Sequence, residues 1–240
     1  ASRAGIEAAR YPIDEDFGVA RGVEIGADDW LLCVNYFGLC DAQVDAAVER
    51  FGTERVVVDN SHALFSRPRA CRATIFSPRK FVGAPDGGYL VTAYPVPAPV
   101  AQDDGSAARC EPLRVRAAKS AEAGYAEYLR MEAGLAGLPP LRMSSLTHDV
   151  LARADYEAIA QRRRVNFRQL EELLGARNRS ALRLVAGSVP LAYPFIRETR
   201  GLRDDLYSRR IYVPRYWPHL ADAASGAPAW ERHLAVHCLP

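Results

Sequence analysis

Residues 30–59 decide the fold and read WLLCVNYFGLCDAQVDAAVERFGTERVVVD. The run 30–38 is continuously apolar and ends in glycine, which is typical of a strand buried on both faces. Residues 41–51 carry apolar side chains at helical spacing, and 55–59 form a second apolar run. A strand, a helix and a strand within about 30 residues predict a right-handed βαβ crossover, and therefore a parallel sheet.

The rest of the chain predicts a mixed architecture. Residues 94–112 are rich in proline and indicate a linker or surface crossing. The remaining expected elements are strands at 73–76, 88–92, 181–186, 191–197 and 210–213, and helices at 118–136, 154–174 and 199–207. We therefore expect an α/β fold, with residues 1–117 as part of a mainly parallel large domain. Residues 118–240 would form a smaller α+β C-terminal domain.

Composition and charge exclude several classes of protein. Of the 240 residues 49% are hydrophobic and 25% charged, which is the balance of an ordinary soluble protein. A net charge of +2 gives no electrostatic case for nucleic acid, and the Arg162–Arg164 run indicates a solvated helix face or a set of salt bridges. No apolar stretch approaches the roughly 20 residues that span a bilayer. Five cysteines without C-x-x-C spacing predict reduced thiols in the cytoplasm, and the histidines show no metal-ligand spacing.

The two lysines are a further feature of the composition. Of 31 basic residues, only Lys80 and Lys119 are lysines. Arginine is always charged, whereas a desolvated lysine can lose its proton and form a Schiff base. Because Arg79 already supplies positive charge beside it, Lys80 is a candidate for a reactive amine. An ordinary surface charge is the alternative, and composition alone leaves both interpretations open.

Asp59 ends a strand of the predicted parallel sheet, at the edge where open α/β sheets bind ligands. Lys80 follows later in the chain, and Ser77 lies shortly before that lysine. This arrangement is expected for pyridoxal phosphate. The carboxylate keeps the ring nitrogen protonated, the lysine holds the aldehyde, and a hydroxyl binds a phosphate oxygen. A simple cap of the following turn is the alternative for Asp59.

Several short motifs follow one another in the order of a known family. They are VNYFG (34–38), VDNSHA (58–63), SPRK (77–80), GG (87–88), RMS (142–144), the long helix at 154–174, IYVP (211–214) and WP (217–218). With these motifs the chain resembles the fold-type-I pyridoxal-phosphate enzymes, and among them the DegT/DnrJ/EryC1/StrS sugar aminotransferase family. The resemblance implies transfer of an amino group from a donor such as glutamate to a keto-sugar or nucleotide sugar, in a homodimer.

The resemblance also implies roles for single residues. Lys80 would be the Schiff-base lysine and proton shuttle, and Asp59 would pair with the pyridinium nitrogen. The other implied cofactor contacts are His62, in place of a glutamine, Asn35, near the O3′ oxygen, and Ser77, at the phosphate. From the residues themselves, Tyr216 and His219 are candidate substrate contacts in the C-terminal part.

The chain also departs from the family pattern. The family has an N-terminal part before these motifs, so we expect this sequence to be the later part of a longer chain. Pro140 replaces the asparagine that precedes Arg-Met in the family, and Ser77 stands closer to the lysine than is usual. Two alternatives therefore remain open: another pyridoxal-phosphate reaction on the same fold, and a degenerate member without activity.

Overall fold

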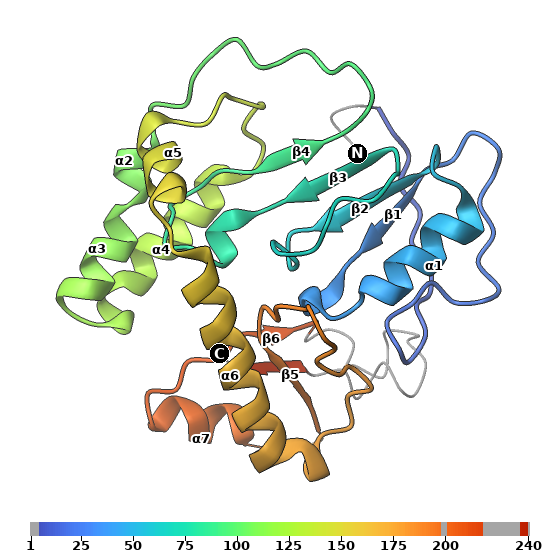
Figure 1. Cartoon of the computed structure of the whole chain (residues 1–240). Helices are drawn as coiled ribbons and strands as arrows, with labels where there is room; N and C mark the ends of the chain where they lie inside the picture. The colour runs from blue at the N-terminus through green and yellow to red at the C-terminus, as the bar shows by residue number, and fades with distance from the viewer. Residues whose placement is uncertain (1–4, 198–200, 218–235, 240) are drawn as a thin grey trace.

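The computed structural model describes residues 5–197, 201–217 and 236–239. They form two sheets. A four-stranded sheet has the order β1-β2-β3-β4 and a three-stranded sheet the order β5-β7-β6. Helix α1 lies against the first sheet, α2–α5 gather beyond the other end of that sheet, and α6 leads from them to the second sheet (Figure 1). The chain is thus a mixed α/β fold, as predicted.

The bounds of the elements are as follows. The strands are β1 (Leu31–Val34), β2 (Val56–Asn60), β3 (Ala73–Phe76), β4 (Tyr89–Val91), β5 (Tyr193–Ile196), β6 (Arg215–Tyr216) and β7 (Val236–Leu239). The helices are α1 (Asp41–Phe51), α2 (Ser106–Arg109), α3 (Glu111–Ala118), α4 (Ala121–Leu135), α5 (Ser145–Ala152), α6 (Tyr156–Leu174) and α7 (Leu202–Ser208). Short 3-10 turns are η2 (Tyr36–Gly38), η3 (Pro78–Lys80) and η4 (Gly175–Arg177).

The first sheet contains the predicted crossover. Strands β1, β2 and β3 pair in parallel, and β4 closes the sheet in the antiparallel direction. Helix α1 begins and ends at the predicted residues, because the apolar positions that face the sheet recur at helical spacing and the chain turns at Gly52 with φ +86°. The parallel sheet inferred from residues 30–59 is therefore confirmed.

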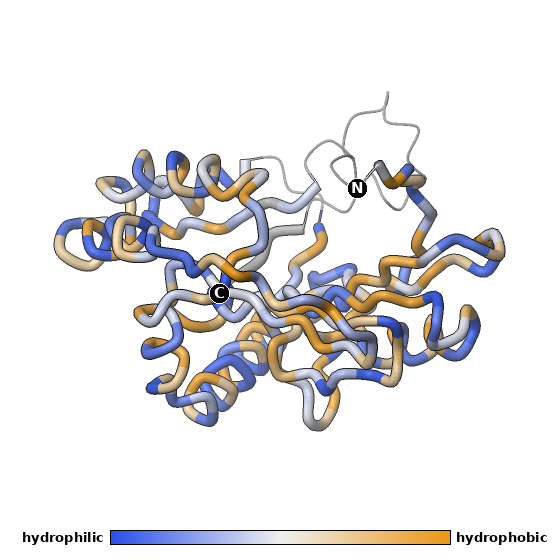
Figure 2. Tube along the Cα trace, turned by 90° about the horizontal axis from the view of Figure 1, so that it is seen from above, coloured by the Kyte–Doolittle hydropathy of each residue, from blue (hydrophilic) through white to orange (hydrophobic). Residues whose placement is uncertain are grey.

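Only one face of this sheet is well buried. On the α1 side, Leu31, Val56 and Val58 pack into one apolar cluster. On the opposite face, Leu32 is 50% exposed and Ile75 39% exposed. The expectation of strands buried on both faces is thus wrong for β1, because alternate side chains point to opposite faces and α1 covers one of them. Figure 2 shows how the apolar residues concentrate along the strands.

The second sheet packs against α6 and shares its core with the first part of the chain. Phe167 of α6 and Tyr193 of β5 belong to the same buried cluster as Phe17 and Phe37. The predicted domain boundary between residues 117 and 118 falls inside α3. The division into two domains stays a prediction.

Three expectations about local structure are wrong. Residues 181–186 form no strand, because the side chains of Asn178 and Ser180 hold the neighbouring backbone in turns. The side-chain Oδ1 of Asn178 accepts from the Ser180 N–H at 3.0 Å. The predicted strand at 210–213 does not form, since Arg210 adopts φ +59° and turns the chain. The supposed linker at 94–112 contains α2 and the start of α3.

Candidate active site

The carboxyl ends of the parallel strands bring four of the predicted site residues to one edge of the sheet. Asn35 follows β1, and its N–H donates to the Asp59 carbonyl oxygen at 3.0 Å, near the end of β2. Ser77 follows β3 and leads into η3, where Pro78 takes the first helical position. The fixed φ of proline suits that position, and Lys80 ends the turn. Lys80 is therefore held at the carboxyl edge of the sheet.

Lys80 lines a cavity of about 900 Å³ between η3, α4, α6 and the second sheet. Burial lowers the pKa of Lys80 below its ordinary value; the Asp59 carboxylate opposes this, and the adjacent Arg79 adds to it. Desolvation disfavours the ammonium form, so a larger fraction of neutral amine is present than on an exposed lysine. The reactive-amine interpretation of Lys80 thus has a physical basis.

Arg79 is engaged elsewhere. Its guanidinium donates to both carboxylate oxygens of Glu132 on α4, at 2.6 and 3.3 Å. Such a forked pair holds the arginine in one geometry and balances its charge. The two neighbouring cations therefore differ: Arg79 is paired, whereas no carboxylate in the described part of the chain forms a salt bridge with Lys80.

Asp59 carries out the capping role that the sequence left open. Its Oδ1 accepts a hydrogen bond from the Ser61 N–H at 2.8 Å, which fixes the turn after β2. No described residue donates to its Oδ2. The carboxylate is also close enough to influence the pKa values of both Lys80 and His62. A capping bond to one oxygen leaves the other available to a ligand.

His62 is buried next to the same charges. The pKa of His62 is lowered from 6.5 to about 4, first by burial and then by the nearby Lys80 ammonium, while the Asp59 carboxylate opposes the shift. The ring packs against Phe37 and Tyr216, with both ring centroids at 5.5 Å from its own. Its Nδ1 is buried and has no hydrogen-bond partner among the described residues. Because buried polar atoms are nearly always satisfied, this nitrogen calls for a partner from outside the described chain.

The remaining predicted residues divide into two groups. Tyr216 lines the same cavity as Lys80, and Ser77 is half-buried with a hydroxyl that makes no hydrogen bond to the described residues. Asn35 is fully buried, and its side chain is already used: the amide donates to Asp41 Oδ1 at 2.8 Å, and the carbonyl oxygen accepts from the Cys40 N–H at 3.1 Å. The structure does not bring the Asn35 side chain to Lys80.

His219 lies outside the described residues. Among the residues that are described, no group of three side chains is arranged to hold a metal ion. No helix in the described ranges is both long and apolar enough to cross a bilayer.

The sequence analysis missed the contribution of α6 to the cavity. Arg162 and Arg163 line it together with Asn166. The expectation of a set of salt bridges along this run is wrong for the described residues: Arg163 and Arg164 donate to backbone carbonyl oxygens instead. The expectation of a solvated face holds for Arg162, which is exposed. The only signal in the sequence was three adjacent arginines on a predicted helix.

Comparison with known proteins gives a limited result. No family model matches the chain, and no curated protein matches it. Among solved structures, the crystal structure of a DegT DnrJ EryC1 StrS aminotransferase from Brucella abortus is similar, with 18% sequence identity and a TM-score of 0.49. The match covers 88% of this chain and 59% of that one, so the chain spans less than two thirds of its structural relative. At this level the similarity carries no argument about the fold or the activity of the chain.

Proposed function

We propose that this chain is a pyridoxal-phosphate-dependent aminotransferase that acts on a keto-sugar or nucleotide sugar, with Lys80 as the residue that holds the cofactor. One observation carries the proposal. A cavity-lining lysine with a lowered pKa lies at the carboxyl edge of a parallel sheet, within electrostatic reach of Asp59 and His62. The family resemblance of the motifs supplies the substrate class.

The residues at this edge fit the cofactor chemically. Lys80 offers an amine, and Asp59 a carboxylate with one oxygen to which no described residue donates. His62 offers a buried Nδ1 that lacks a partner, and Ser77 a hydroxyl that makes no hydrogen bond to the described residues. When bound, pyridoxal phosphate supplies an electron sink for chemistry at the carbon that bears the amino group. Asn35 does not fit, because its side chain is consumed by its bonds to Asp41 and Cys40.

Each side chain at this edge would have a separate role in the reaction. The neutral fraction of Lys80 would hold the aldehyde of the cofactor, and the same nitrogen would carry a proton to and from the substrate. The Asp59 carboxylate would hold a proton on a ring nitrogen by charge-assisted hydrogen bonding. His62, which its lowered pKa keeps neutral, accepts or donates one hydrogen bond without adding charge. Tyr216 packs against His62 and limits its movement.

The first test is covalent labelling. The purified chain is incubated with pyridoxal phosphate, reduced with borohydride, digested and analysed by mass spectrometry. We expect a reduced adduct on the peptide that contains Lys80, and none in the Lys80→Arg variant. Lys119→Arg is the matched control, because Lys119 is exposed. Equal labelling of both lysines, or none at either, would refute the assignment of Lys80.

The second test addresses the reaction. The loaded protein is given glutamate and a panel of keto-sugars, free and nucleotide-linked, and formation of 2-oxoglutarate is measured. Production that requires both glutamate and a keto-sugar is expected. Labelling of Lys80 without any transfer of an amino group from glutamate would indicate another pyridoxal-phosphate reaction. We also propose a homodimer, which light scattering of the loaded protein tests directly.

A further inference from the structure

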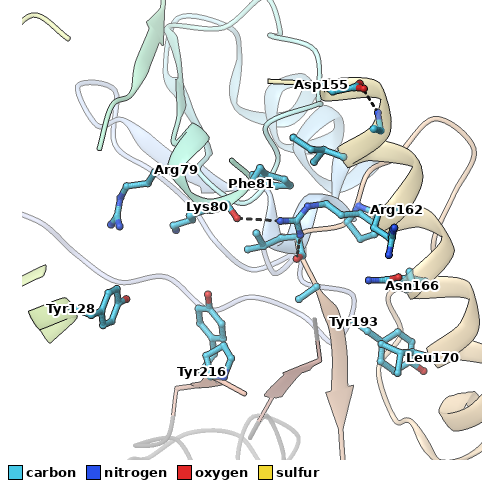
Figure 3. A pocket seen from close by; sticks show the side chains of 18 of the residues that line it. Arg79, Lys80, Phe81, Tyr128, Asp155, Arg162, Asn166, Leu170, Tyr193 and Tyr216 are labelled. Carbon is cyan, nitrogen blue, oxygen red and sulfur yellow. Dashed lines mark hydrogen bonds between the residues drawn. The ribbon is translucent and has the colours of Figure 1, made fainter. Parts of the chain in front are cut away.

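Helix α6 presents a group of polar side chains to the cavity that also contains Lys80. Arg162 and Asn166 are four residues apart, so they lie on the same face of the helix, and both line the cavity (Figure 3). Arg163, next along the helix, lines it as well. Neither arginine forms a salt bridge within the described residues, although Arg163 is partly buried.

Arg163 is fixed in place by neutral groups. Its Nη1 donates to the Leu191 carbonyl oxygen at 2.5 Å and its Nη2 to the Lys80 carbonyl oxygen at 3.3 Å. The guanidinium carbon lies 4.6 Å from the ring centroid of Phe81. Burial lowers the pKa of Arg163, which means that its charge has lost hydration without gaining an opposite charge. A guanidinium has five N–H donors, so several remain for a ligand.

The acidic groups of the cavity do not compensate this charge. Glu132 is paired with Arg79. The Asp155 carboxylate caps α6, where its Oδ1 accepts from the Ala158 N–H at 2.9 Å, and it supplies only one negative charge against the two guanidinium groups of Arg162 and Arg163. The cavity therefore keeps an excess of positive charge at its α6 wall, where an anion would be attracted and a cation repelled.

We propose that Arg162, Arg163 and Asn166 form an anion-binding subsite that takes a phosphate or carboxylate group of the molecule occupying the cavity. Arg163 is held ready by its two carbonyl partners, and the exposed Arg162 can close on the ligand. The flat guanidinium matches the oxygen spacing of both groups, and the Asn166 amide adds a donor. The subsite deepens the proposed function, and rests on it only where it takes the bound anion to be the substrate.

Isothermal titration calorimetry at low ionic strength tests the subsite without turnover. The probes are inorganic pyrophosphate, for a phosphate, and glutarate, for a carboxylate. Arg162→Gln is the test variant, since an exposed side chain can be replaced without disturbing the fold. Arg168→Gln is the matched control, because Arg168 is exposed on the same helix, carries the same charge and does not line the cavity. We expect saturable binding, weakened about tenfold or more by Arg162→Gln and little by Arg168→Gln.

Each result decides the matter. Binding of pyrophosphate alone identifies a phosphate ligand, binding of glutarate alone a carboxylate ligand, and both outcomes support the subsite if only Arg162→Gln weakens them. Equal weakening in the two variants would reduce the effect to net charge and overturn the proposal, as would the absence of saturable binding of either probe. Borohydride labelling of Lys80 in the same variants separates this outcome from failure of the proposed function.

Discussion

The lowered pKa of His62 makes the stability of the protein depend on pH in a defined direction. The imidazole is buried at 8% exposure, and its pKa falls from 6.5 in the unfolded chain to about 4 in the folded one. Between these values the unfolded state binds a proton that the folded state does not. The free energy of unfolding therefore decreases as the pH falls from about 6.5 towards 4. One pKa unit is worth about 1.4 kcal/mol, so the full loss is about 3 kcal/mol.

Urea denaturation at several pH values between about 7 and 4 measures this loss. Carboxylates titrate in the same range, so the comparison of variants isolates the imidazole. We expect His62→Leu to be less sensitive to acid than the parent chain by about 3 kcal/mol over that range. His148→Gln, which removes an exposed imidazole, should follow the parent curve. Parallel curves for the parent and His62→Leu would show that burial does not lower the pKa of His62, and would refute the reasoning.

Two further predictions concern the segments that hold the site. Asp86 is buried six residues after Lys80 and accepts from Ser106 Oγ at 2.7 Å and from Arg109 Nε at 2.6 Å. Asp86→Ala should cost about 3 kcal/mol in urea denaturation, the lower end for breaking a buried ion pair, because Arg109 keeps Asp103 as a partner. The exposed Asp104→Ala should cost under about 0.5 kcal/mol, and equal losses would contradict the role of the network. Gly38 has φ +68°, and an added Cβ would lie 2.7 Å from a backbone carbonyl oxygen. Gly38→Ala should lower stability by at least about 2 kcal/mol. An added Cβ at Gly52, which also has positive φ, meets no atom within 4 Å, so Gly52→Ala should cost less; the same cost at both sites would refute the steric argument.

What the sequence could predict follows from the range of the interactions. The β1-α1-β2 crossover depends on side chains within about 30 residues. The spacing of its apolar residues can therefore be recognised from the local sequence alone. Helix α6 can be predicted in the same way, since Asp155 caps its start and apolar residues recur along it. The strand expected at 181–186 has a similar apolar character, but local side-chain bonds to the backbone compete successfully with sheet pairing. Apolar runs alone do not reveal that competition.

The site divides in the same way. Asn35 and Asp59 are both polar residues at strand ends, so the sequence pattern alone does not distinguish their positions. Side chains alternate along a strand, so Asn35 shares the buried face of Leu31 and Cys33, while Asp59 points to the other face. The contacts of Asn35 with Asp41 and Cys40 follow from that parity. By contrast, Arg163 meets the Lys80 carbonyl oxygen across 83 residues of chain, and no local pattern could indicate such a contact.

The cations around the cavity differ in the contacts that they make. Arg79 makes a forked pair with Glu132, and Arg163 bridges two carbonyl oxygens. Both tasks use several N–H groups in one plane, which a lysine ammonium cannot provide. Lys80 makes no salt bridge within the described residues, and its lowered pKa brings the neutral amine within reach. An arginine there would remain charged at every physiological pH, so Lys80→Arg would preserve the charge of the cavity and remove the amine on which the proposed function depends.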